Sequence, residues 1–183
     1  MSGVSTIDAP TLMLSKGSLS FQGAGGFSSS AVKVMMLNDA NLDISGKTGN
    51  LNIAELSSSP TATAPTIFLG ANSLEINAIP SLLSYASWST PNLSYNTFNG
   101  VISGTGGVSL SASSQLMPGQ VAGLTFKGVN TYRGPTTIHA DTILRLEGAG
   151  SVAASSKITN DGFLDIGAHQ FIHQSLATAA TFS

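Results

Sequence analysis

The chain has 183 residues and a formal net charge of −2 at pH 7, a length that fits one domain with a substantial core. Charged residues make up only 9%, and the seven Lys and Arg form no basic cluster, which excludes a strong nucleic-acid footprint. No run of 18 apolar residues predicts membrane insertion, and the absence of Cys excludes disulfides and thiolate metal sites.

The first half of the chain predicts short β-strands with one buried face. Apolar and polar residues alternate there with period 2 and never with the period of a helix. The expected strands cover 11–14, 18–21, 32–37, 42–44, 51–53, 66–69 and 74–76. Gly- and Ser-rich stretches at 23–26 and 28–30 are expected to be loops. The first ten residues lack the basic start and apolar run of a secretory signal.

Residues 77–97 are expected to be an inserted loop that protrudes from the rest of the domain, with a short helical turn at 81–87. This stretch holds the only Trp and two of the three Tyr of the chain. Exposed aromatic side chains on such a loop can stack on sugars or anchor a protein partner. Tyr85, Trp88 and Tyr95 are therefore the candidate ligand-binding residues, and the alternative is that they fold back and cover the side of the domain.

The second half of the chain repeats one apolar pattern at a fixed step. The triplets Leu-Thr-Phe at 124–126, Leu-Arg-Leu at 144–146 and Leu-Asp-Ile at 164–166 begin 20 residues apart. Equivalent strands at a constant step are typical of a β-solenoid. The polar stretch 111–123 is expected to be a loop.

Three short sequence motifs, here called words, occur in or just before the part of the chain with this step. They are FNGVISGTGG at 98–107, GVNTYRGPTTI at 128–138 and TNDGFLDIG at 159–167. In this order they resemble the autotransporter-associated β-strand repeat, and LGANSLEI at 69–76 is similar to a further word of that family. The resemblance covers roughly 37–167 and is strongest in its second half.

The resemblance implies an all-β, right-handed parallel β-helix, with residues 1–183 forming a single elongated domain. The low charge is consistent with such a stack, because identical charges would lie about 4.8 Å apart in successive turns. The resemblance further implies a passenger segment of a Gram-negative autotransporter, exported to the cell surface. Such a segment is a non-catalytic scaffold for adhesion or effector presentation that assists passenger secretion. Host-surface or matrix glycans and proteins are the expected partners, together with self-association through the open end strands.

Candidate chemical groups are few and scattered. His139 and Asp141 are expected to share a strand face beside Thr137, but no activated Ser motif accompanies them. His169 and His173 stand four apart without a third metal ligand. The sequence therefore predicts no catalytic, cofactor-binding or metal-binding residues.

Asp39, Asn41 and Asp43 alternate as calcium ligands can, but they lack the Gly and the distal Glu of an EF-hand loop. We interpret this segment, and the Asn-Asp-Gly at 160–162, as turns.

Two alternatives to the scaffold remain open. One is a polysaccharide lyase or glycoside hydrolase on a β-helix, which requires clustered carboxylates. The other is a specific carbohydrate- or protein-binding module that acts through the 81–95 loop.

Overall fold

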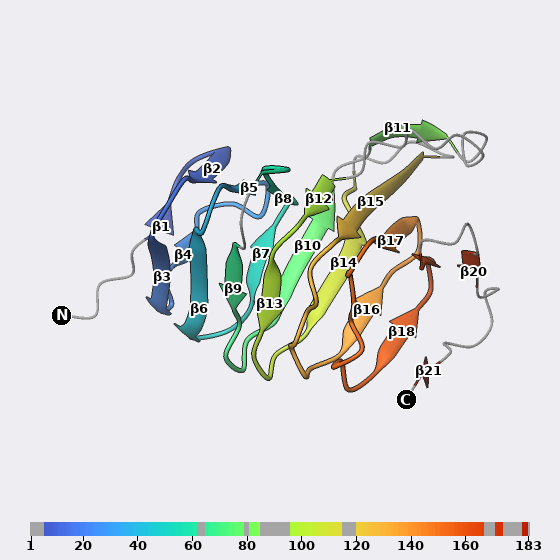
Figure 1. Ribbon diagram of the computed structural model, residues 1–183. Helices are drawn as coiled ribbons and strands as arrows, with labels where there is room; N and C mark the ends of the chain where they lie inside the picture. The colour runs from blue at the N-terminus through green and yellow to red at the C-terminus, as the bar shows by residue number, and fades with distance from the viewer. Residues whose placement is uncertain are drawn as a thin grey trace.

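The computed structural model of the protein describes residues 6–61, 65–78, 81–84, 96–114, 120–166, 171–173 and 181–182, with backbone alone at 81–84, 171–173 and 181–182. The described residues form β-strands, turns and irregular segments and no helix, and most strand pairs are parallel. The protein is therefore an all-β protein with several parallel sheets (Figure 1).

The β5 sheet consists of β2 (Thr11–Leu14), β5 (Lys33–Met36) and β8 (Glu55–Ser58), in that order. All its pairs are parallel, and Leu12, Val34 and Leu56 are in register at steps of 22 residues. Val34 and Leu56 are buried, while the residues on either side of them are more exposed. The period of 2 that predicted these strands is thus the alternation between core and surface.

The β15 sheet begins beside the β5 sheet and extends through the C-terminal half of the protein (Figure 1). It contains the parallel strands β12 (Asn96–Phe98), β15 (Gln120–Phe126), β17 (Thr142–Leu146) and β19 (Phe163–Asp165), flanked by β11 (Ser81–Ser84) and β20 (Phe171–His173). Leu124 pairs with Leu144, and Leu144 pairs with Leu164. The step of 20 residues in the sequence is therefore confirmed as strand register.

Two further series of strands complete the fold. The β6 sheet contains β3 (Ser18–Gly23), β6 (Asn41–Lys47), β9 (Thr66–Phe68) and β13 (Val101–Ser103). The β10 sheet contains β7 (Leu51–Ile53), β10 (Leu74–Ala78), β14 (Val108–Ala112), β16 (Thr136–Ile138), β18 (Ile158–Asn160) and β21 (Thr181–Phe182). A separate parallel pair, β1 (Thr6–Ile7) and β4 (Gly26–Phe27), stands near the N-terminal end.

The sheets share one apolar core. Its members come from all four sheets and include Leu42, Ile53, Ile67, Leu74, Phe98, Phe126 and Leu144. The rings of Phe98 and Phe126, which are in register on β12 and β15, pack edge to face with centroids 6.5 Å apart. Burial of these stacked side chains supplies the main driving force for folding.

The β15 sheet also buries apolar side chains on its outer side. Ile143 and Phe163 are in register on the faces of β17 and β19 opposite to Leu144 and Leu164, yet both are buried. Neither belongs to the shared core. This sheet therefore has two buried faces along part of its width, unlike the β5 sheet.

Three local expectations were wrong. Ser81–Ser84, expected within a helical turn, form strand β11, which pairs antiparallel with β15. Gly26, expected in a loop, pairs in β4. The stretch 111–123, expected to be a loop, contributes its ends to β14 and β15.

The two ends of the protein differ in strand pairing. At the C-terminal end, β18 and β19 pair antiparallel with β21 and β20. The expected open edge is therefore covered there by the tail itself. At the other end, the outer edges of β2 and β3 have no partner strand among the described residues.

Candidate functional site

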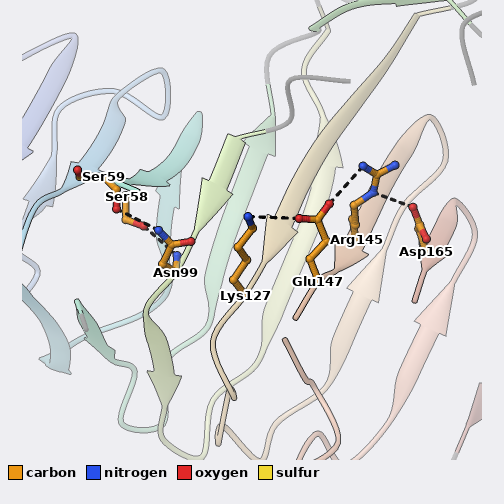
Figure 2. A network of polar contacts seen from close by, with 7 residues as sticks. All are labelled: Ser58, Ser59, Asn99, Lys127, Arg145, Glu147 and Asp165. Carbon is orange, nitrogen blue, oxygen red and sulfur yellow. Dashed lines mark hydrogen bonds and ion pairs between the residues drawn. The ribbon is translucent and has the colours of Figure 1, made fainter. Parts of the chain in front are cut away.

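A line of charged side chains crosses the outer surface of the β15 sheet (Figure 2). Lys127 Nζ lies 3.4 Å from Glu147 Oε2, and Arg145 Nη1 lies 3.4 Å from Glu147 Oε1. Arg145 Nε donates to Asp165 Oδ2 at 2.7 Å. The four residues alternate in sign, so each charge lies beside an opposite charge.

Strand register places these charges. Arg145 and Asp165 are the central residues of two triplets and are direct partners across β17 and β19. Lys127 and Glu147 each follow directly after strands that pair, with Phe126 in register with Leu146. The step of 20 residues was predicted from the sequence, but the ion pairs Lys127–Glu147 and Arg145–Asp165 were not. Applying that step to the charged positions would have identified both.

This geometry suits a structural role better than catalysis. The Arg145 side chain is only 16% exposed and the Asp165 side chain 5%, beside the buried outer residue Phe163. One guanidinium holds both carboxylates, so neither is presented to a substrate as an unpaired acid or base. The line therefore neutralises charge in the stack.

A cavity of about 260 Å³ lies at the Lys127 end of this line, lined by Ser58, Pro60, Thr97, Asn99 and Lys127. It marks the place where β12 lies beside β8 without a strand ladder between them. Asn99 bridges the two: its backbone N donates to Ser58 Oγ at 2.8 Å and its Nδ2 to the Ser59 carbonyl at 3.0 Å (Figure 2).

Three polar residues of the GVNTYRGPTTI word, Asn130, Tyr132 and Thr136, are buried and hydrogen-bonded, whereas Thr131 and Arg133 are exposed. Asn130 Oδ1 accepts from the backbone N of Ile102 at 2.9 Å, in the place where a neighbouring strand would offer a carbonyl. The Tyr132 and Thr136 hydroxyls are 2.6 Å apart, and Thr136 Oγ1 donates to Ser155 Oγ at 3.0 Å. Burial raises the pKa of the Tyr132 phenol well above its usual value. These side chains bind neighbouring segments of the chain to one another.

His139 and Asp141 do not share a strand face, so that expectation was wrong. β16 ends at Ile138, and Asp141 stands in the following turn with a left-handed φ of 59°. His139 Nε2 lies 3.2 Å from Ser109 Oγ on the surface. The turn forms because Thr142 Oγ1 donates to the His139 carbonyl at 2.6 Å.

The segment with Asp39, Asn41 and Asp43 contains a turn followed by a strand. Asn38 has a φ of 49°, which turns the chain, and β6 begins at Asn41. Asp43 Oδ1 accepts from the backbone N of Ser45 at 2.8 Å, and hydrogen bonds from Ser45 hold the pKa of this carboxyl below its usual value. Within the part of the chain that the structure describes, no group of three His, Cys, Asp or Glu residues is placed to hold a metal ion.

The aromatic candidates Tyr85, Trp88 and Tyr95 lie outside the described residues, as does His169. The side chain of His173, in β20, is likewise not described. The expectation of a ligand-binding insertion at 77–97 therefore stays a prediction.

Comparisons with protein-family models, with curated proteins and with solved structures found no match. Over the described residues, no helix has the length and apolar character needed to cross a membrane.

Proposed function

We propose that the protein is a right-handed parallel β-helix that acts as a non-catalytic, surface-exposed passenger segment of a Gram-negative autotransporter. It would serve as a scaffold that presents adhesive or effector sequence and assists passenger secretion. The four sheets of mainly parallel strands around one core, with steps of 20 to 23 residues in several places, support a helical winding of the chain.

One observation carries the scaffold proposal. Three of the polar residues in the word that resembles the autotransporter repeat, Asn130, Tyr132 and Thr136, are buried and form their hydrogen bonds within the fold. A motif used for binding or catalysis would present its polar groups to a ligand instead. The charged groups of Arg145 and Asp165 are likewise hydrogen-bonded to each other within the fold.

The export part of the proposal is tested by placing the chain between a secretory signal and a C-terminal translocator barrel in a Gram-negative host. We expect the segment to reach the surface, measured by protease shaving of intact cells. Asn130→Ala should lower the surface signal, because it removes a buried bond between neighbouring segments. A segment that remains in the periplasm while the same translocator displays a control passenger would overturn this part. A crystal structure would test the handedness.

The absence of catalysis is tested on a panel of glycans and matrix proteins with the purified chain. We expect no turnover. Hydrolysis or elimination on any polysaccharide would replace the scaffold with a β-helix enzyme. Binding without turnover that is lost in Tyr85→Ala and Trp88→Ala would replace it with a binding module at the predicted insertion.

A further inference from the structure

A second hollow, of about 220 Å³, opens on the surface near the N-terminal end. We call it the Lys47 hollow. Its polar lining consists of Ser28, Ser29, Ser30, Lys47, Asn50 and Asn52. It lies where β4 and β7 come side by side without a strand ladder between them. The hollow is therefore built from the ends of strands and the loop after β4.

The Lys47 hollow is cationic. Lys47 forms no ion pair with any described carboxylate, and the one hydrogen bond of its ammonium is a long one of 3.4 Å to the Thr48 carbonyl. Its aliphatic stem crosses β4 at Gly26, where an added Cβ would lie 3.4 Å from Lys47 Cε. The residues that line the hollow include no Asp or Glu among those described. An anion entering it would meet a positive charge that is in no ion pair with a described carboxylate.

Among the neighbouring hydroxyl and amide groups, Ser29 offers a donor, whereas Ser28 and Asn50 already donate to carboxylates. Ser29 Oγ accepts from the backbone N of Ala31 at 3.0 Å, which leaves its proton to donate elsewhere. Asn50 is fixed at the rim, because its Nδ2 donates to Glu75 Oε1 at 2.7 Å and its Oδ1 accepts from the backbone N of Ser73 at 3.1 Å. Ser28 differs, since its hydroxyl donates to Asp8 Oδ1 at 2.8 Å. Asp8 and Glu75 are thus the nearby negative charges that an anion would have to tolerate.

We propose that the Lys47 hollow binds an oxyanion, sulfate or carboxylate, that is carried by a sugar. An ammonium with hydroxyl donors is suited to either oxyanion. The volume is several times the roughly 30 Å³ share of one water, yet it lies below the roughly 300 Å³ at which pockets for drug-sized ligands begin. It therefore suits one charged sugar unit. This inference is independent of the proposed scaffold and export function.

The test is an amide NMR titration of the full chain with four probes: inorganic sulfate, N-acetylglucosamine 6-sulfate, glucuronate and uncharged N-acetylglucosamine. We expect saturable shifts at residues 26–30 and 47–52 with the three anions and none with the uncharged sugar. The sulfated sugar should bind more tightly than inorganic sulfate. Equal shifts with the uncharged sugar would contradict the proposal that the hollow recognises an oxyanion. Equal affinity for inorganic sulfate and the sulfated sugar would contradict the proposal that it recognises the sugar.

Matched variants separate the site from general charge attraction. Lys47→Gln should weaken binding of the sulfated sugar by about five-fold, the upper range for an exposed ion pair, while Lys47→Arg should retain it. Asp8→Asn should strengthen binding, because it removes a neighbouring negative charge. Lys16→Gln, an exposed cation in the turn before β3, should change nothing. A Lys47→Gln variant with unchanged affinity and a native amide spectrum would overturn the proposal.

Discussion

Arg145 and Asp165 stand 20 residues apart in the sequence and directly opposite each other in the structure, with Nε and Oδ2 2.7 Å apart. Both side chains are almost removed from water. Two charges buried in this way depend on each other, because desolvation of either one alone is not offset by solvent.

Asp165→Asn should therefore destabilise the protein by about 2–4 kcal/mol, since it removes the nearest carboxylate from the largely buried Arg145 guanidinium. Urea unfolding at neutral pH measures this. The matched control is Glu147→Gln, whose side chain is 37% exposed and should cost no more than about 1 kcal/mol. Equal losses in the two variants would contradict the ranking by burial.

Asn130 Oδ1 accepts the hydrogen bond from the backbone N of Ile102 that the carbonyl of a neighbouring strand would otherwise accept. Asn130→Ala should cost about 1–3 kcal/mol, because it leaves the buried backbone N of Ile102 without this acceptor. Thermal and urea unfolding measure the loss. Thr131→Ala is the control, since Thr131 is exposed and its backbone bond to Ile102 is retained. A stability of Asn130→Ala equal to that of the control would show that Asn130 is dispensable.

The periodic part of this fold could be predicted from sequence. Strands β2 and β7 have the expected bounds, and the triplets at 124–126 and 144–146 are in register with each other and with Leu164 and Asp165 of the third, whereas Ile166 lies beyond β19 and is exposed. Alternation with period 2 and a constant step both follow from parallel strands that pair in register around one core.

The parts without a local signal could not be predicted. β4 is two residues long and contains Gly26, so no alternation marks it. Ser81–Ser84 pair with β15, a partner some 40 residues away, and no short-range pattern specifies such a contact. The burial of Ile143 and Phe163 on the outer side of the β15 sheet likewise depends on what covers them and not on the strand pattern.

The ionisation of Tyr132 should couple to stability at alkaline pH. Burial raises the pKa of the Tyr132 phenol in the folded protein, whereas in the unfolded chain this phenol titrates at about pH 10. The stabilisation from the protonated phenol is therefore complete below about pH 10 and is lost as the pH rises toward the folded-state pKa. Tyr132→Phe should cost about 1 kcal/mol at neutral pH, because the hydrogen bond to Thr136 is lost, and should show a smaller further loss above about pH 10. Urea unfolding at both pH values measures the difference, and parallel alkaline losses would contradict it.

Asp43 should affect stability at the acid end. Its folded-state pKa lies below 3.8, first because of the hydrogen bonds from Ser45. Its stabilising contribution is therefore present above that value and is lost as the pH falls through the lower folded-state pKa. Asp43→Asn should make the acid limb of the stability curve shallower. Ser45→Ala, which keeps the backbone donor, should raise the Asp43 pKa measured by carboxyl NMR, and an unmoved pKa would remove Ser45 as the cause.

Gly128, in the word that begins GVNTYRG, should tolerate no side chain. A Cβ there would lie 1.9 Å from the carbonyl oxygen of Gly100, on a neighbouring segment of backbone that cannot rotate away as a side chain would. Gly128→Ala should therefore destabilise by about 1–3 kcal/mol or prevent folding, because the two segments must separate. Gly49→Ala is the control, since it has open space around it and only a left-handed φ of 87° to strain, which should cost about 1 kcal/mol. Thermal unfolding of the two variants compares the costs. If Gly128→Ala were as stable as the control, the backbones at Gly100 and Gly128 would have room to move apart. Their close approach would then not be the reason for a glycine at position 128.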